Sequence, residues 1–241
     1  MKTAVLFDLG NTLVHYFKRH EFQKILKQAI LEVQDFLLQK DIFHISLDNM
    51  WRAVKAEDFE SNDYQVRPLE ERLIRIFQLD NDNLAPSSDL LTTMCRRFMK
   101  PIFAKAYCYE DTLPTLEELK SKGYKTAIVS NTTWGSPANL WREHLKLLGL
   151  STYFDVVVFC RDVGWRKPAK QIFQYTLQKL QVPSQQCVFV GDDPRWDVAG
   201  PRTVGIDPIL LNRKTSMQCI KKKTKLIKNL NELIEKLQQR I

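Results

Sequence analysis

Residues 3–17 read TAVLFDLGNTLVHYF, and they set the organisation of the whole chain. Residues 3–8 form a short apolar run, which is typical of a strand buried on both faces of a parallel sheet. The run ends in Asp8, and Gly10, Asn11 and Thr12 follow in a segment that indicates an anion-holding loop. A carboxylate in this place, at the end of a buried strand, indicates a nucleophile.

The composition is that of a globular protein, with 241 residues, 44% hydrophobic and 27% charged. This length allows one large domain or a core with a smaller companion. The cysteines show no CxxC and no clustered Cys/His spacing, so we expect reduced thiols and no zinc site. These cysteines are Cys95, Cys108, Cys160, Cys187 and Cys219. The start MKTAVLFDL carries an acid where a signal peptide would stay apolar, and no apolar run is long enough for a membrane span. We therefore expect a cytoplasmic protein without a membrane partner.

The formal net charge of +8 admits two interpretations. A positive field attracts phosphorylated metabolites or nucleic acid. Much of the surplus lies in the basic cluster Lys221–Lys228, which no RNA-binding or Arg/aromatic pattern accompanies. A solvated surface explains such a charge run better, so we do not expect a nucleic-acid partner.

The segment from about residue 19 to 107 has a helical pattern. Phe22, Leu26, Ile30, Val33 and Leu37 recur at intervals of three and four residues, which predicts an amphipathic helix. Helical patterns continue over 46–60, 68–77 and 87–106, with Ser87 or Ser88 as the N-cap of the last. The segment therefore predicts a bundle of roughly four helices without a strand.

After residue 110 helices and strands alternate, which predicts parallel strands with helical crossovers on both faces of a Rossmann-like sheet. The expected strands span 124–131, 154–159, 186–193 and 206–211, and the expected helices span 113–123, 139–150, 168–182, 195–205 and 226–237. The first strand belongs to the same sheet, so the helical bundle is an insertion. We expect an α/β core of residues 1–14 and 108–241 and a helical cap of residues 15–107.

The predicted strand ends carry polar residues at the edge of the sheet where open α/β proteins place their functional groups. These residues are Asp8, Ser130, Asn131, Asp192 and Asp193, together with the stretch that follows the strand 154–159 and leads to Lys167. Attack of an Asp carboxylate on phosphorus brings two anions together, so Mg²⁺ and a lysine would supply the compensating charge. Asp192 suits a metal ligand and Lys167 a clamp. Ser130 can donate to a phosphoryl oxygen, and Asn131 orients the loop.

Four motifs resemble those of the haloacid dehalogenase (HAD) superfamily with a helical cap: FDLGNTL, IVSN, Lys167 within GWRKPAKQIF, and VGDDPRWD. The resemblance covers essentially the entire chain. It implies that Asp8 is the nucleophile and a metal ligand, and that Ser130 and Lys167 bind the phosphoryl group. It also implies that Asp192 ligates Mg²⁺ and that Asp197 supports the metal. Asp193 lies where the family varies.

Gly10 departs from the phosphatase pattern, which has a second Asp at this place. That Asp is the general acid–base, a group worth about 10²–10⁴ in rate. In the family the position also gives its backbone carbonyl to Mg²⁺, which Gly10 retains. Three outcomes are open. His15 or His20 replaces the acid, although an ordinary polar residue at the approach to a helix explains both better. Otherwise the substrate has a good leaving group such as an acyl phosphate, or the chain is a degenerate enzyme that binds a phosphate ligand or a partner.

The expected activity is Mg²⁺-dependent hydrolysis of a small phosphorylated metabolite through an aspartyl-phosphate. Two other family activities stay open. A 2-haloacid dehalogenase uses the same Asp without metal, although the acid-rich GDDPRWD favours Mg²⁺. A phosphonatase would need a cap lysine such as Lys18, Lys24, Lys27 or Lys55. The sequence does not give the substrate or the oligomeric state.

Overall fold

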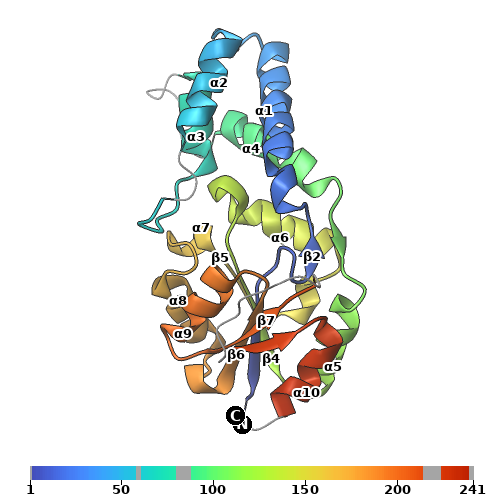
Figure 1. Ribbon diagram of the computed structural model, residues 1–241. Helices are drawn as coiled ribbons and strands as arrows, with labels where there is room; N and C mark the ends of the chain where they lie inside the picture. The colour runs from blue at the N-terminus through green and yellow to red at the C-terminus, as the bar shows by residue number, and fades with distance from the viewer. Residues whose placement is uncertain (1, 58–60, 80–87, 214–223, 239–241) are drawn as a thin grey trace.

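A computed structural model describes residues 2–57, 61–79, 88–213 and 224–238. Figure 1 shows two parts, a sheet covered by helices and a helical layer above one end of that sheet. In the described residues, no helix is both long and apolar enough to cross a membrane. The α/β class expected from the sequence is confirmed.

Over the residues that the structure describes, the sheet has six parallel strands in the order β5-β4-β1-β6-β7-β8. The strands are β1 (Ala4–Phe7), β4 (Lys125–Ser130), β5 (Val156–Phe159), β6 (Cys187–Gly191), β7 (Asp207–Leu211) and β8 (Lys225–Ile227). Its helices are α5 (Thr112–Ser121), α6 (Ala138–Leu147), α7 (Cys160–Val163), α8 (Lys170–Leu180), α9 (Gly200–Arg202) and α10 (Leu233–Gln238). Helices α5 and α10 lie on one side of the sheet, and α8 and α9 lie on the other (Figure 1).

Strand β1 is buried on both faces because alternate side chains point to opposite sides of a strand. Val5 and Phe7 belong to the apolar cluster that includes residues of α5 and α10. Ala4 and Leu6 belong to a second cluster, which includes residues of α8. All four side chains are fully buried, so the continuous apolar run marks a central strand, as expected.

Two predicted helices differ from the structure. The expected helix over 226–237 begins with strand β8, and its helical part is a short 3-10 turn followed by α10. The prediction was wrong for this start because pairing with β7, which the local sequence does not reveal, turns residues 225–227 into an edge strand. The expected helix over 195–205 is a π-helix over Pro194–Ala199 that continues into α9.

The helical layer consists, in the described residues, of α1 (Phe22–Gln39), α2 (Leu47–Ala56), α3 (Leu69–Phe77) and α4 (Asp89–Phe103). Leu26, Ile30, Val33 and Leu37 of α1 are buried, which confirms the periodicity of three and four. Ser88 caps α4, since its Oγ accepts a hydrogen bond from the Leu91 amide at 3.3 Å. Ser87 and the end of the helix expected over 46–60 lie outside the described residues.

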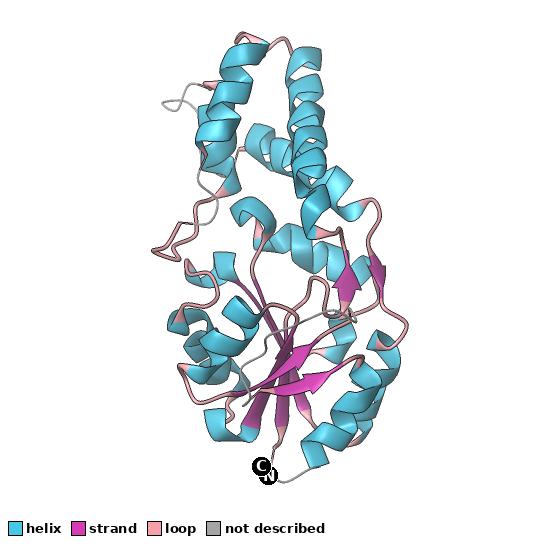
Figure 2. Ribbon diagram, viewed as in Figure 1, coloured by secondary structure: helices cyan, strands magenta, loops and turns pink. Residues whose placement is uncertain are grey.

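Two short antiparallel strands join the two parts, β2 (Val14–His15) and β3 (Tyr107–Cys108). Figure 2 shows them between the sheet and the helical layer. Both boundaries expected between core and cap fall within this ladder. The division into a core domain of residues 1–14 and 108–241 and a cap domain of residues 15–107 stays a prediction.

The segment between α2 and α3 holds the helical layer against the sheet. The Val66 amide donates to the Gly164 carbonyl at 2.9 Å, and the Arg166 amide donates to the Tyr64 carbonyl at 2.8 Å. Phe98 of α4 stacks on Trp134, which follows β4, with ring centroids 5.6 Å apart. These contacts place the helical layer over the carboxyl ends of the strands, beside Lys167.

Candidate active site

The parallel sheet brings Asp8 and Ser130 together across 122 residues of sequence. Strand β1 lies between β4 and β6, so the residues that follow these three strands meet at one edge of the sheet. The hydroxyl of Ser130 donates a hydrogen bond to Oδ1 of Asp8 at 3.1 Å. Both side chains are buried, which holds the Asp8 carboxylate in one orientation.

Lys167 lies in the loop before α8 and is 1% exposed. Its Nζ donates to Oδ1 of Asp8 at 2.6 Å and to Oδ1 of Asp197 at 2.7 Å. Burial lowers the pKa of the Lys167 ammonium, but the neighbouring Asp197 and Asp8 carboxylates outweigh burial and raise it. Lys167 is therefore a fixed positive charge between two carboxylates at neutral pH.

Asn131 holds the backbone of Lys167. Its Oδ1 accepts a hydrogen bond from the Lys167 amide at 2.8 Å, and its Nδ2 donates to the Lys167 carbonyl at 3.3 Å. This pair of bonds fixes the lysine by its main chain. The amide of Asn131 thus faces Lys167, which suits a positioning role.

Asp193 and Asp197 belong to the π-helical turn after β6. Oδ1 of Asp193 accepts from the Arg195 amide at 2.8 Å, so Asp193 caps the turn. The Asp193 amide donates to Oδ2 of Asp197 at 3.1 Å, and the Asp197 amide donates back to the Asp193 carbonyl at 2.8 Å. The turn therefore aims Asp197 back at the end of the sheet, where it meets Lys167.

Gly191 leaves the space that Asp197 needs. A Cβ at this position would lie 2.4 Å from Cγ and from Oδ2 of Asp197, far closer than real contacts allow. Sequence reasoning did not single out Gly191, although it directly precedes Asp192 in VGDD. Its role emerges only from the packing of the turn against the strand end.

Asp8, Asp192 and Asp197 each offer a carboxylate oxygen, and these three oxygens lie within 4.8 Å of one another. Two unit charges 4.8 Å apart repel by about 3.5 kcal/mol at an effective dielectric constant of about 20. Burial raises the pKa of Asp192 and of Asp197, and the nearby carboxylates raise both further. The site therefore favours an additional cation, and a largely buried all-oxygen donor set fits Mg²⁺.

Thr12 and Arg213 also support Asp8, and sequence reasoning gave neither a role at the site. The Thr12 hydroxyl donates to Oδ2 of Asp8 at 3.4 Å. Arg213, two residues after β7, donates to the Thr12 carbonyl at 2.8 Å and to both oxygens of Asp111 at 2.9 Å. The position of Thr12 four residues after Asp8, in the same loop, is a local signal. For Arg213 there is none, since its partners lie 102 and 201 residues away.

Gly10 lies in the turn that follows Asp8, where the amides of Leu13 and Val14 both donate to the Leu9 carbonyl at 3.0 Å. Among the described residues, a Cβ at position 10 would meet only Cδ2 of Tyr16, at an ordinary contact distance of 3.7 Å. The backbone of Gly10 is also outside the left-handed region. Neither space nor conformation requires glycine here, so the missing acid is a chemical feature of the chain.

The sequence matches the haloacid dehalogenase-like hydrolases over residues 2–205. The chain belongs to this family. A glyceraldehyde 3-phosphate phosphatase of Methanothermobacter thermautotrophicus is 36% identical over 88% of this chain and 86% of its own length. A HAD phosphatase structure from Thermococcus onnurineus is similar with a TM-score of 0.63 and 30% identity, over 99% of this chain and 98% of that one. An (S)-2-haloacid dehalogenase 4A of Burkholderia cepacia is 32% identical over 70% of this chain and 71% of its own length.

The matches confirm the family expected from the four motifs. The chain is a hydrolase of this family, and the relatives named above include phosphatases. The roles expected for Asp8, Ser130, Lys167, Asp192 and Asp197 stay predictions, although the structure places these residues together. The carbonyl of Gly10 as a metal ligand also stays a prediction.

The two histidines considered as replacement acids lie in different surroundings in this HAD hydrolase. His15 Nδ1 is 3.4 Å from the Tyr109 hydroxyl, and its ring lies against Tyr107, with centroids 5.0 Å apart. His20 is exposed in a 3-10 turn before α1.

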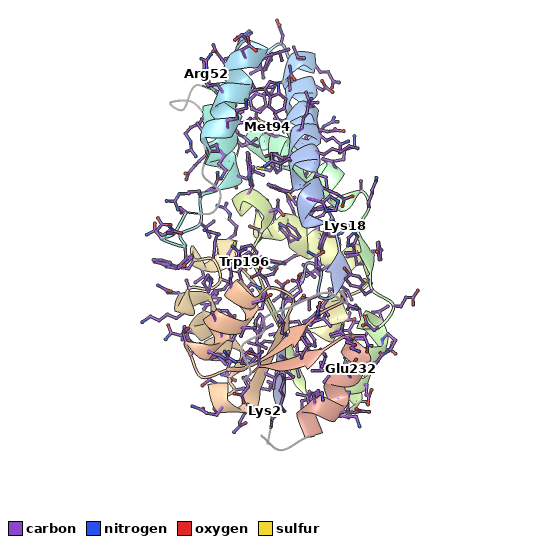
Figure 3. The ribbon with its side chains drawn as sticks, viewed as in Figure 1. Lys2, Lys18, Arg52, Met94, Trp196 and Glu232 are labelled. Atoms are coloured by element: carbon purple, nitrogen blue, oxygen red, sulfur yellow. The ribbon has the colours of Figure 1, made fainter. Side chains whose placement is uncertain are left out.

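Figure 3 shows Trp196 between the helical layer and the sheet, whereas Arg52 lies at the far end of the helical layer. The described part of the Lys221–Lys228 cluster begins at residue 224.

Proposed function

We propose that this chain is a Mg²⁺-dependent phosphatase that hydrolyses a small phosphorylated metabolite through a phosphorylated Asp8. The observation that carries the proposal is the shared contact of Lys167 and Ser130 with one oxygen of Asp8, beside the buried carboxylate of Asp197 and the partly buried carboxylate of Asp192. A site with one lysine and three carboxylates suits a phosphoryl group and a divalent cation together. The phosphatases among the relatives support the same class of substrate.

Each residue has a defined part in the proposed reaction. A carboxylate oxygen of Asp8 forms a bond to phosphorus while the bond from phosphorus to the leaving oxygen breaks. The electron pair of the broken bond stays on the leaving oxygen, which takes a proton from solvent where it departs as an alkoxide. Lys167 and Ser130 donate to the phosphoryl oxygens and so offset their negative charge. Asp8, Asp192 and Asp197 would hold Mg²⁺, with the Gly10 carbonyl as a further ligand. The cation would neutralise the charge of the phosphoryl group.

Water completes the reaction. It attacks phosphorus in the aspartyl-phosphate, and the bond between Asp8 and phosphorus breaks. One proton of the water stays on the released phosphate and the other passes to solvent. The helical layer, held over the site by the contacts of Val66 and Arg166, excludes bulk water during the first step.

The test is a panel of phosphorylated metabolites with and without Mg²⁺, together with acetyl phosphate and p-nitrophenyl phosphate. Asp8→Asn removes the nucleophile, so we expect turnover to fall on the order of 10⁴-fold or more. Asp35→Asn, an exposed position on α1, is the matched control and should keep wild-type turnover. Turnover retained by Asp8→Asn would exclude the covalent mechanism.

The similarity to a haloacid dehalogenase favours a second candidate, cleavage of a carbon–halogen bond by Asp8 without metal. The three clustered carboxylates count against it, because a metal-free site gains nothing from concentrating negative charge. Release of halide from 2-haloacids in the presence of EDTA would support the dehalogenase. A chain that binds phosphate but turns over no substrate would instead be a ligand-binding protein.

A further inference from the structure

Tyr16 is a buried side chain with an unused polar group. It follows β2, on the path from the sheet to the helical layer, and is 7% exposed. Its ring packs against Trp141 and His144 of α6 and Phe103 of α4, with centroids 5.3 to 6.1 Å away. Within the described residues its hydroxyl has no hydrogen-bond partner. A buried hydroxyl without a partner is rare in folded proteins, and it points to a partner that comes with a ligand.

Tyr16 also borders the place where the family's general acid would lie. A Cβ at Gly10 would lie 3.7 Å from Cδ2 of the Tyr16 ring, so any side chain at position 10 would enter the space beside this ring. Burial raises the pKa of the Tyr16 phenol, and the charges of Cys108 and Asp8 raise it further. The phenol therefore stays protonated at neutral pH and can donate a hydrogen bond.

We propose that the Tyr16 hydroxyl donates a hydrogen bond to the leaving-group oxygen of the substrate, in the place of the absent acid at position 10. This inference rests on the proposed phosphatase activity. It also names a substrate class, phosphate compounds whose leaving group departs as a stable anion. Acyl phosphates are the natural members of this class, since a carboxylate leaves without needing a proton.

The chemistry with an acyl phosphate balances without a general acid. An oxygen of Asp8 bonds to phosphorus, and the bond between phosphorus and the acyl oxygen breaks. The electron pair of that bond leaves with the carboxylate, which accepts the hydrogen bond from Tyr16. Tyr16 keeps its proton throughout. Water then cleaves the aspartyl-phosphate, leaving one proton on phosphate and one in solvent.

The experiment compares wild type with Tyr16→Phe on acetyl phosphate, p-nitrophenyl phosphate, phenyl phosphate and glycerol phosphate. Negative charge on the leaving oxygen grows as the leaving group becomes poorer, so the loss of the donor should matter more along this series. We expect kcat/KM to fall about threefold on acetyl phosphate and about thirtyfold on phenyl phosphate. Tyr153→Phe is the matched control and should leave all four rates unchanged, because the Tyr153 hydroxyl donates to Glu117 away from the site.

A second measurement separates this role from a structural one. Removing a buried hydroxyl without a partner leaves no group unpaired, so Tyr16→Phe should unfold at the same temperature as wild type or higher. Gly10→Asp should raise hydrolysis of glycerol phosphate by up to about 10²-fold by restoring the acid. In the Gly10→Asp background, Tyr16→Phe should cost less than it does in wild type.

The outcomes distinguish the two proposals. Turnover that depends on Asp8 but falls equally on all four substrates in Tyr16→Phe, or does not fall, would overturn the role of Tyr16 and leave the phosphatase intact. A lower unfolding temperature of Tyr16→Phe would also overturn it, since the hydroxyl would then have a partner in the protein. A wild type without turnover on any phosphate would overturn both proposals.

Discussion

Replacing Lys167 by methionine should lower the free energy of unfolding, because the site would lose the positive charge that offsets its carboxylates. The lysine lies 2.6 and 2.7 Å from two carboxylate oxygens, and its side chain is 1% exposed. Methionine fills a similar volume but carries no charge. Asp8, Asp192 and Asp197 would then lie together without their buried cation.

The size of the effect follows from burial. Removing one partner of a buried ion pair costs about 3–5 kcal/mol, because the other charge stays buried and unpaired. We expect Lys167→Met to lower the free energy of unfolding by this amount at about pH 7.5 without Mg²⁺. Loss of the lysine also raises the pKa of Asp197 further above its ordinary value of 3.8. A carboxyl group whose folded pKa is raised costs stability above its unfolded pKa, so the loss should shrink as the pH falls toward about 4.

Urea unfolding followed by circular dichroism measures this loss at about pH 5 and about pH 7.5, with EDTA and with Mg²⁺. Mg²⁺ should recover part of the loss, because it binds the folded carboxylates and stabilises the folded state by mass action. Lys170→Met, an exposed position at the start of α8, is the matched control. A loss below about 1 kcal/mol, or one that does not change with pH, would refute the argument.

Two further predictions follow from the packing of single residues. Gly191→Ala places a Cβ 2.4 Å from the Asp197 carboxylate, so turnover should fall at least about tenfold. The rise in unfolding temperature that Mg²⁺ causes should also become smaller. The control is Gly10→Ala, which has room for its Cβ at 3.7 Å and should fold normally. Burial lowers the pKa of His144, so wild type should lose unfolding free energy as the pH falls below about 6.5, and His144→Phe should lose less. An equal loss in both proteins would exclude His144 as the cause.

Much of the fold could be predicted because it depends on local patterns. The buried run that ends at Asp8 and the spacing from Leu26 to Leu37 each reflect the period of one element. Strand β8 could not be predicted, because residues 225–227 become a strand by pairing with β7. A three-residue edge strand has too little sequence to be distinguished from the first turn of a helix.

The same division holds for the candidate site. The sequence by itself determined which residues are the candidates for the chemistry, since Asp8, Ser130, Lys167 and Asp192 each lie at the end of a strand or precede a helix in a recognisable motif. Only the tertiary structure decided how they act on one another. Lys167 reaches Asp8 across 159 residues, and the Tyr16 ring beside Gly10 is packed by side chains from two distant helices. A motif shows which residue types lie near one another in the sequence. The pairing of strands, the burial of side chains and the hydrogen-bond partners of polar groups depend on contacts that form only when the whole chain folds.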